Sequence, residues 1–399
     1  MTGFDVTRVR AQYPALGDGR AWLDGAAGTQ VPEQVIEAVS AAMRGGLANQ
    51  GGVFPAARRA DALVDAARRA FAAFTGAPDP VGVVLGPTAT ALFVRLAAAL
   101  EPTWGPGDEI VVTEADHEAN VAPWTQAAAR AGATVRTARL GTDGGLPAGA
   151  VTSLIGSRTR LVAVTAASNL TGARVDVAAV TAAAREVGAT SVVDGVHHAA
   201  YSRVDVRALG ADLYATSAHK WAGPHVSALV AADPAALEAI DPPRPAGAPA
   251  SGPARFEQGT NPFAAMAGVA AAVAHWSGMT DDDPRAAQQA AATHTAELGQ
   301  RLWSALGGMA HVRRYGPDGP ADVRTPVAAF RVAGRTPAEV VAVLDAAGVN
   351  AWAGWAYAWG AAGALGVRDD GGLVRLSPNH YSRAWEVDRA LDVLGTLAP

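Results

Sequence analysis

Short apolar runs alternate with longer, helically periodic segments through the first two thirds of the chain. Five runs have the length and β-rich composition of buried strands: VGVVLG (81–86), EIVVTEA (109–115), LVAVTAA (161–167), SVVDG (191–195) and ADLYATSA (211–218). The segments ADALVDAARRAFAAF (60–74) and VDVAAVTAAAREVGA (175–189) are periodic as helices are, and a glycine lies near the end of the second. This alternation predicts a mainly parallel sheet that is covered by helices on both faces.

A different pattern follows the proline-rich stretch at 241–256, which we expect to be an exposed or semi-extended connection. Helices are predicted at 264–276 and near 283–306. The C-terminal part then reads TPVAAFRV, TPAEVVAVLDAAGV, an aromatic loop, GLVRLSP and EVDRALDVLGTL. This order of strand, helix, strand and helix predicts a compact α+β second domain, and 399 residues suffice for one large and one smaller domain.

Polar side chains of chemically useful types follow each predicted strand. Because ligands of such sheets bind at the carboxyl ends of the strands, these side chains are candidates for one site. In chain order they are Thr88 and Thr90, then His117 and Asn120, Asn169, Asp194 and His197, and finally Ser217, His219 and Lys220. The two threonine hydroxyls and the freed N–H groups at the helix start, that of Ala89 among them, could hold a phosphate. A plain turn with a helix cap would explain this first group as well.

The composition sets Lys220 apart from every other basic residue. The 32 basic residues are 31 arginines and one lysine. The two types are interchangeable where only charge matters, but only the ammonium can lose its proton and attack a carbonyl. Lys220 is therefore a candidate nucleophile, and the alternative is that compositional drift left one lysine by chance.

Charge and composition narrow the classes of partner. The chain has 50% hydrophobic and 17% charged residues, a net charge of −5 and no basic run, so we expect no nucleic-acid partner. The N-terminal sequence lacks the apolar core of a secretory signal, and the apolar runs are too short to span a bilayer. We therefore expect a cytoplasmic protein without a membrane partner. The absence of cysteine excludes disulfides, thiolate metal sites and a cysteine nucleophile.

A metal site is one interpretation of the histidines and the carboxylate at the strand ends, which are His117, Asp194, His197, His198 and His219. The sequence contains no HExxH or HxH pattern, and single histidines at strand ends usually pack or support other residues. We therefore expect no metal.

Pyridoxal 5'-phosphate (PLP) is the alternative that uses the lysine. This cofactor needs a Schiff-base lysine, a phosphate cup, an aspartate facing the pyridine nitrogen and a flat group against the ring. Lys220 would form the Schiff base, and Asp194 would keep the ring nitrogen protonated. The protonated ring could then take up the electron pair left when a bond at the substrate's Cα breaks. The strand ends supply all of these parts.

Motifs spread over nearly the whole chain carry a resemblance to a known family. They are WLDGAAGTQVP (22–32), DHEANVAPW, ASNLTG, VVDGVHH, SAHKWAGPH, FEQGTNP (256–262) and VRLSPNHYSRAWEVDRAL (374–391). The chain resembles the class V aminotransferases of PLP fold type I, and within them the branch of cysteine desulfurases, C–S lyases and isopenicillin N epimerase relatives. The resemblance implies an α/β large domain at 20–275 with a mainly parallel sheet of the seven-stranded type, and a smaller α+β domain formed by 1–19 and 276–399.

The resemblance also implies roles for individual residues. The catalytic residues would be Lys220, linked to the cofactor, Asp194, paired with its pyridinium nitrogen, and His117, stacked on its ring. Other cofactor contacts would come from Asn169 and His197 near the phenolic oxygen, and from Thr88, Ser217 and His219 at the phosphate. Thr260 of a second subunit would join the phosphate site, which implies a homodimer with composite active sites. Arg375 would bind the α-carboxylate of an amino-acid substrate, a task that suits a planar guanidinium.

The segment VNAWAGWAYAWGAAGALG (349–366) departs from the family pattern. Desulfurases of this family pass sulfur to a cysteine on a mobile loop in this region, and here there is none, so the persulfide mechanism cannot run. The segment instead carries Trp352, Trp355, Tyr357 and Trp359. These rings could be core, but their short spacing with glycine and alanine favours a substrate-lining loop, with Trp355 and Tyr357 as substrate-binding residues.

We therefore expect a PLP-dependent enzyme that acts at Cα or Cβ of an amino acid. The first choice is β-elimination by a C–S lyase, in which the freed Lys220 takes the Cα proton as general base. The alternatives are an aminotransferase, an epimerase or a decarboxylating deaminase in the biosynthesis of small molecules or secondary metabolites. An inactive relative that serves as a binding or assembly partner is disfavoured by the retention of Lys220 and Asp194. A hydrolase is the remote interpretation, because no GxSxG motif is present.

Overall fold

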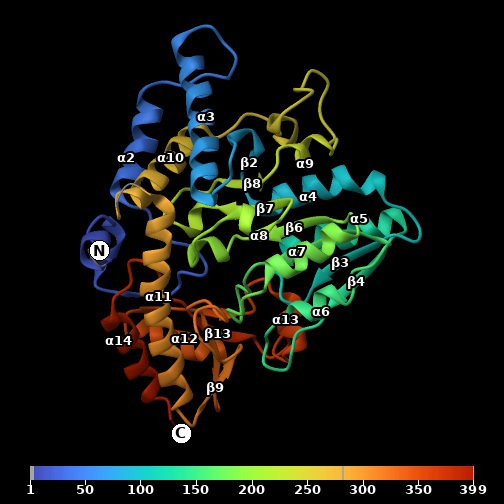
Figure 1. Ribbon diagram of the computed structural model, residues 1–399. Helices are drawn as coiled ribbons and strands as arrows, with labels where there is room; N and C mark the ends of the chain where they lie inside the picture. Colours follow the sequence, from blue (N-terminus) through green and yellow to red (C-terminus); the bar gives the residue numbers. More distant parts are fainter. Residues whose placement is uncertain (1–3, 281–282, 399) are drawn as a thin grey trace.

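The computed structural model describes residues 4–280 and 283–398, and its largest element is a seven-stranded sheet (Figure 1). In spatial order the strands are β2 (Val83–Gly86), β8 (Ser227–Ala231), β7 (Leu213–Ser217), β6 (Thr190–Asp194), β5 (Thr159–Thr165), β3 (Glu109–Thr113) and β4 (Thr134–Ala138). Strand β8 is antiparallel to both neighbours, and the other pairs are parallel. The prediction of an α/β fold with a mainly parallel sheet of seven strands is confirmed.

The five predicted strands are present, and β4 and β8 are two that the apolar pattern did not predict. Strand β4, TVRTA, is an edge strand whose side chains are largely exposed, so it has no apolar run. Strand β8, SALVA, is fully buried but follows the Lys220 turn closely, and such a short run cannot be distinguished from a helical segment by pattern alone.

Successive residues of the strands face two separate hydrophobic cores. On one face, Ile110 and Val112 belong to a core with helices α4 (Ala89–Leu100) and α5 (Ala122–Ala131). On the other face, Val111 belongs to a core with α3 (Pro55–Thr75), α7 (Val177–Glu186) and α10 (Phe263–Ser277). Because helices cover both faces, the strands carry apolar residues at successive positions instead of alternating with polar ones.

The smaller domain lies below the large sheet in Figure 1 and has its own antiparallel sheet. Its strand order is β12 (Trp352–Gly354), β13 (Leu373–Leu376), β10 (Ala328–Val332) and β9 (Val312–Tyr315). Helices α11 (Pro284–Gly307), α12 (Pro337–Ala346) and α14 (Ala384–Gly395) pack on this sheet and enclose a third core. Residues Ala21 and Leu23 also belong to this core, because β1 (Ala21–Trp22) pairs with β11 (Val349–Asn350).

Two segments differ from their predicted forms. The aromatic segment is not one loop: it contains β12, a tight turn and α13 (Trp359–Ala364). The proline-rich stretch is largely exposed at 243–251, but its end turns back into the protein and buries Arg255 and Phe256. The remaining helices are α1 (Val6–Arg10), α2 (Glu33–Arg44), α6 (Ala148–Thr152), α8 (Val206–Leu209) and α9 (Ala235–Glu238).

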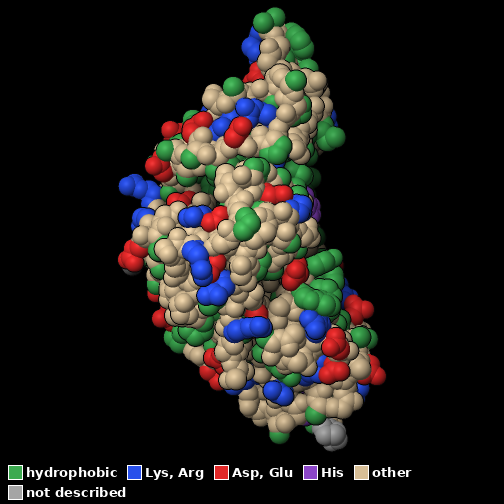
Figure 2. Space-filling view, turned by 90° about the vertical axis from the view of Figure 1, so that its right-hand side faces the viewer, with side chains coloured by type: hydrophobic (Ala, Val, Ile, Leu, Met, Phe, Trp, Pro, Cys, Tyr) green, Lys and Arg blue, Asp and Glu red, His purple; other side chains and the backbone are tan. Residues whose placement is uncertain are grey.

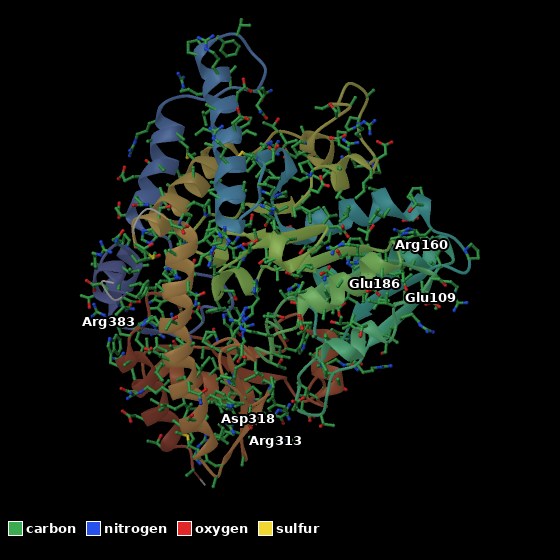
Figure 3. All side chains as sticks on the ribbon, viewed as in Figure 1. Glu109, Arg160, Glu186, Arg313, Asp318 and Arg383 are labelled. Atoms are coloured by element: carbon green, nitrogen blue, oxygen red, sulfur yellow. The ribbon has the colours of Figure 1, made fainter. Side chains whose placement is uncertain are left out.

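Two ion pairs lie at the amino ends of the strands. Glu109 and Arg160 lie at the amino ends of β3 and β5, at the right of Figure 3, where Arg158 pairs with Glu109 and Arg160 with Asp108. On the face shown in Figure 2, basic and acidic side chains are interspersed, so that face has no continuous basic field. Within residues 4–280 and 283–398, no helix has the length and apolar character that crossing a membrane requires.

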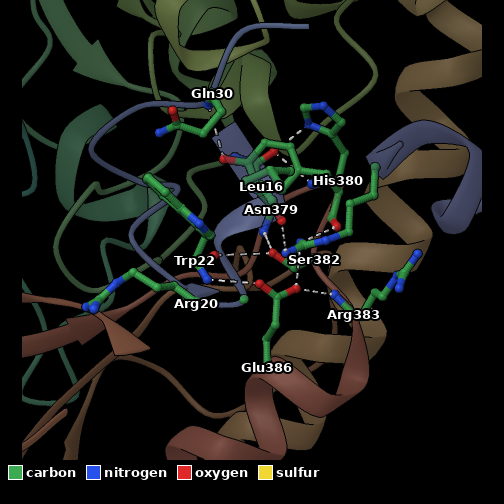
Figure 4. A network of polar contacts seen from close by, with 12 residues as sticks. Leu16, Arg20, Trp22, Gln30, Asn379, His380, Ser382, Arg383 and Glu386 are labelled. Atoms are coloured by element: carbon green, nitrogen blue, oxygen red, sulfur yellow. Dashed lines mark hydrogen bonds and ion pairs between the residues drawn. The ribbon is translucent and has the colours of Figure 1, made fainter. Parts of the chain in front are cut away.

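A buried polar network fixes the N-terminal segment against both domains (Figure 4). The Arg10 guanidinium donates to Glu386 Oε2 at 3.0 Å, and the same carboxylate accepts from the Trp22 N–H at 2.9 Å. Near these groups the Tyr13 hydroxyl lies 2.8 Å from His275 Nε2 of α10 and 2.6 Å from His380 Nε2. The segment before β1 therefore contacts a large-domain helix and the strand–helix connection of the smaller domain at once.

Replacing Arg10 by Met should destabilise the protein by about 3–5 kcal/mol, because it leaves a buried carboxylate without its cation. Arg301→Met is the matched control, since the Arg301–Asp388 pair is largely solvent-exposed and such pairs contribute less than about 1 kcal/mol. Urea denaturation followed by circular dichroism measures both variants. Equal losses of stability in the two variants would show that the buried pair does not fix the N-terminal segment.

Candidate active site

The carboxyl ends of the parallel strands surround two adjoining cavities. The inner cavity has a volume of about 210 Å³ and is lined by the predicted residues Thr88, Ala89, His117, Asn169, Asp194, His197, Ser217, His219 and Lys220. The outer cavity has a volume of about 250 Å³ and is lined by residues of the smaller domain, including Trp352, Tyr357 and Arg375. The two cavities share three lining residues, His117, Asn169 and Lys220. A molecule in either cavity can therefore contact these three side chains.

Lys220 lies in a 3-10 turn (Ala218–Lys220) directly after β7. Its Nζ donates to the backbone carbonyls of Ala26 at 2.6 Å and Ala27 at 2.9 Å. Burial and, to a lesser degree, the Arg375 guanidinium lower the pKa of this amine to about 7, against the opposing effect of the Asp194 carboxylate. A large fraction of the lysine is therefore the neutral, nucleophilic amine near neutral pH.

Asp194 ends β6 and is buried in the wall of the inner cavity. Burial raises its pKa to about 6, while the hydrogen bond from the Val196 N–H, 2.9 Å from Oδ1, and the Lys220 ammonium lower it. A cation placed against this carboxylate would keep it ionised. The site thus supplies an anionic partner for a protonated ring nitrogen.

Behind this site lies Asp116, a second buried carboxyl that the sequence analysis did not select. It accepts hydrogen bonds from Asn120 Nδ2 at 2.7 Å, from the Thr165 N–H at 3.0 Å and from the Thr113 hydroxyl. Burial and the nearby Asp194 raise its pKa to about 8, although these hydrogen bonds oppose the shift. Its position directly before His117 in the motif DHEAN was the available signal. The network holds the start of the His117 turn against β5.

Three histidines line the inner cavity in their neutral forms. His117 Nδ1 accepts from the Ala119 N–H at 3.0 Å, so its ring proton lies on Nε2, and burial lowers its pKa to about 4. Burial lowers the pKa of His219 to about 3, and its ring stacks on His225 with centroids 4.7 Å apart. Burial also holds the pKa of His197 well below its usual value, and its Nε2 lies 3.1 Å from the Thr325 hydroxyl.

Two buried polar atoms of the inner cavity have no hydrogen-bond partner among the described residues. They are His197 Nδ1 and Asn169 Oδ1. An unpaired buried polar atom is costly, so such atoms mark a place where a ligand supplies the missing partner. The Asn169 Nδ2 is already used, because it donates to the Ala356 carbonyl at 2.8 Å.

One end of the inner cavity suits an anion. Thr88 caps α4 with its hydroxyl 3.0 Å from the Ala91 N–H, and Thr88, Ala89 and Thr90 at the start of this helix line the cavity. Ser217, whose hydroxyl lies 2.6 Å from that of Ser227, and His219 line the same cavity. A helix N-terminus surrounded by hydroxyls favours a phosphate. Together with Lys220 and Asp194, this arrangement fits PLP.

Arg375 lies on β13, is buried, and faces the outer cavity. Its Nη1 donates to the Asn169 carbonyl at 2.7 Å. Burial lowers its pKa to about 10, and Tyr201 and Asp24 oppose this shift, so the guanidinium stays charged at neutral pH. The cross-strand partner of Arg375 is Trp352 on β12, which places the two side chains on the same face of the sheet.

A tight turn presents Tyr357 at the mouth of the outer cavity. Ala356 (φ 49°) and Tyr357 (φ 57°) both adopt the left-handed conformation, which costs about 1–2 kcal/mol per non-glycine residue. The Ala358 N–H closes the turn on the Trp355 carbonyl at 2.8 Å, and the Glu118 N–H binds the Tyr357 carbonyl at 2.8 Å. The turn is therefore held in a strained form by groups of the large domain, a feature that is common at ligand sites.

Two residues expected to bind cofactor or substrate lie outside both cavities, as does the strand-end candidate Asn120, which donates to Asp116. Thr260 is exposed and lines neither. Trp355 packs its ring against Tyr357, with centroids 5.8 Å apart, and against Trp359, with centroids 5.2 Å apart. Trp352, which was not among the predicted binding residues, lines the outer cavity instead. Within the described ranges, no three histidine or acidic side chains are grouped as metal ligands would be.

Comparison with known sequences links the whole chain to one family. The family model described as aminotransferase class-V matches residues 21–390. An uncharacterized protein of Mycobacterium tuberculosis is 37% identical, with 99% of each chain covered. A probable cysteine desulfurase of Vibrio cholerae is 32% identical, with 97% of each chain covered.

Solved structures of similar fold include a cysteine desulfurase and a PLP-linked complex. The cysteine desulfurase CsdA of Escherichia coli, in an S-sulfonic acid form, has a TM-score of 0.86 at 29% identity, and the match covers 99% of this chain and 98% of that one. A lysine-to-alanine variant of C-DES, with glycine covalently linked to its PLP cofactor, has a TM-score of 0.79 at 22% identity, with 97% and 98% covered. At 22% identity, the likeness to C-DES shows a shared fold and no more.

The lowered pKa of Lys220 predicts an unusual pH profile for its reactivity in the apoprotein. Acylation of Lys220 by a small amine-specific reagent should speed up with pH only to about 7 and then level off, because the neutral form is then saturated. Peptide mass spectrometry at each pH measures the rate, and Nα-acetyl-lysine, with a pKa of about 10.4, is the control. Arg375→Met should move the midpoint up and Asp194→Asn should move it down. A rate that keeps rising to pH 10 would contradict the buried amine.

Proposed function

The chain belongs to the class-V aminotransferase family and is a PLP-dependent enzyme, and from this premise we propose that it cleaves the Cβ–S bond of an S-substituted amino acid. The observation that carries this proposal is the position of Lys220, whose amine lies between two carbonyls at the junction of both cavities. When bound, PLP supplies an aldehyde that condenses with amines and a protonated ring that accepts an electron pair.

The inner cavity would hold PLP through groups that the described residues leave available. Thr88, Ala89, Ser217 and His219 would bind the phosphate at the start of α4. Asp194 would pair with the ring nitrogen. The free atoms His197 Nδ1 and Asn169 Oδ1 lie in the same cavity and would reach the polar edge of the ring, while the neutral His117 ring would lie against its face.

Arg375 would bind the substrate and Lys220 would take a proton from it. Arg375 is charged, buried and open to the outer cavity, so it would bind the α-carboxylate of an amino acid. Lys220 has a pKa of about 7, which suits a general base near neutral pH. It would take the Cα proton, the Cβ–S bond would break, and the sulfur would leave with the bonding pair as a thiolate.

The released sulfur would go to solvent and not to the protein, since the chain has no cysteine. Tyr357 lies at the mouth of the outer cavity. The family resemblance places the sulfur-accepting cysteine of desulfurases in this same segment. The products would be a thiol, ammonia and a keto acid such as pyruvate. This balance needs one water and no oxidant or reductant.

The exposure of Thr260 supports a homodimer with composite sites. Its side chain lies outside both cavities of its own chain, on the segment after the proline-rich stretch. A hydroxyl in this position would be available to the phosphate site of a second subunit.

Borohydride reduction of the PLP-reconstituted protein should leave a cofactor adduct on Lys220. Lys220→Ala and Lys220→Arg should lose both the adduct and the lysine-linked absorbance band, because neither side chain can form the imine. The double variant Lys220→Arg with Arg139→Lys restores one lysine at an exposed position and is the matched control. Absence of the adduct from the wild-type peptide would overturn the role of Lys220.

Incubation of the holoenzyme with S-substituted cysteines and with ordinary amino acids tests the reaction type. We expect thiol, ammonia and keto acid from the S-substituted cysteines at rates at least tenfold above the Lys220→Ala variant, as judged by mass spectrometry. A pyridoxamine form of the cofactor with a keto acid would indicate transamination, and change of the Cα configuration would indicate epimerisation. Carbon dioxide release would indicate decarboxylation, and no change of the cofactor spectrum with any amino acid would indicate an inactive relative.

A further inference from the structure

The residues that line the outer cavity indicate which kind of substrate side chain it can hold. We propose that the substrate bears a bulky, uncharged apolar or aromatic group beyond Cβ, and that this group packs against Trp352 and Tyr357. The inference rests on the proposed function, because it assumes that an amino acid enters with its carboxylate on Arg375.

The charges of the outer cavity are confined to the side next to the inner cavity. Lys220 and Arg375 are the charged residues that line it within the described chain, and both have tasks in holding cofactor and substrate. His117 is neutral, since burial lowers its pKa to about 4. Glu118 and Asp24, carboxylates on neighbouring segments, do not line the cavity. A charged group at the end of a substrate side chain would therefore find no counter-ion and would lose its hydration.

Apart from Asn169 and the neutral His117, the remaining wall consists of aliphatic or glycine residues and two aromatic rings. The aliphatic and glycine residues are Ala26, Ala27, Leu170, Ala353, Gly354 and Ala356. Trp352 and Tyr357 line the same space, and they stay 52% and 65% exposed. Exposed aromatic rings that line one cavity together can form the apolar wall of a binding groove. A substrate with an apolar group would cover both rings, whereas the side chain of cysteine would leave most of the 250 Å³ cavity to water.

The backbone fixes both rings relative to the carboxylate site. Trp352 is the cross-strand neighbour of Arg375, so strand pairing sets their separation. Tyr357 lies on the strained turn, whose Ala356 carbonyl accepts from Asn169 Nδ2 at 2.8 Å. The carbonyl of the same Asn169 accepts from Arg375 Nη1 at 2.7 Å. One asparagine therefore links the carboxylate-binding arginine to the turn that positions the ring, and the rings form a preorganised wall.

Equilibrium binding to the PLP-loaded Lys220→Ala variant tests the substrate class without turnover. The probes are both enantiomers of S-benzyl-cysteine, phenylalanine, alanine, glutamate and lysine, titrated against cofactor absorbance and tryptophan fluorescence. We expect S-benzyl-cysteine or phenylalanine to bind at least tenfold more tightly than alanine, and glutamate and lysine to bind no better than alanine. Glutamate or lysine binding as tightly as the aromatic probes would overturn the inference.

Substitutions in the cavity wall distinguish the effect of the two rings on substrate preference from the effect of the turn backbone. Trp352→Ala and Tyr357→Gly, each added to Lys220→Ala, should reduce the preference for the aromatic probe over alanine about tenfold and leave alanine binding within about twofold, as expected for loss of one aromatic contact. Glycine is chosen at 357 because it adopts the positive φ of the turn without strain. Trp359→Ala is the matched control for the loss of a ring, since Trp359 does not line the cavity. Ala356→Gly tests the turn backbone and removes one methyl group of the cavity wall.

The outcomes distinguish this inference from the proposed function. If amino acids bind but the ratio of aromatic to alanine binding is unchanged in Trp352→Ala and Tyr357→Gly, the assigned substrate class is wrong and the amino-acid function stands. If Ala356→Gly reduces the ratio as much as Tyr357→Gly, the turn backbone and not the ring sets the preference, which also overturns the inference. If no amino acid of either configuration changes the cofactor spectrum, the proposed function fails and this inference fails with it.

Discussion

The site depends on one buried amine. Lys220 Nζ lies within hydrogen-bond distance of two backbone carbonyls, close to the Asp194 carboxylate and the Arg375 guanidinium, in a place where burial disfavours its charge. An arginine could not give up its proton there, so the chain's single lysine occurs where arginine is chemically unsuitable. The strand ends, the neutral histidines and the helix start of α4 are all arranged around this nitrogen.

The two domains contribute different properties to the site. The large sheet supplies a wall of strand ends that is rigid because both of its faces are packed. The smaller domain supplies Arg375, Trp352 and the strained turn at Tyr357. Asn169 joins the two, since its side chain and its carbonyl bind the turn and the arginine. By the proposed function, the strand ends would hold the cofactor and the smaller domain would select the substrate.

Polar residues at the strand ends were easier to predict from the sequence than the buried residues that support them. Buried strands of a covered parallel sheet are short apolar runs, so the polar residue after each run was visible, as with Asp194 and Lys220. Edge strand β4 and short strand β8 lacked that signal. Asp116 was missed because a carboxyl buried by tertiary packing looks like any turn residue in sequence. Trp355 was predicted as a substrate-binding residue and Trp352 was not, because only the β12–β13 register decides which ring lies beside Arg375.

A crystal structure of the PLP-loaded Lys220→Ala variant with S-benzyl-cysteine would decide where cofactor and substrate bind. We expect PLP in the inner cavity, with its ring nitrogen on Asp194 and its phosphate at the start of α4. We also expect the substrate carboxylate on Arg375 and the benzyl ring between Trp352 and Tyr357. A cofactor ring turned away from Asp194, or a substrate carboxylate bound elsewhere than on Arg375, would show that Lys220 is not the centre of the site proposed for this chain.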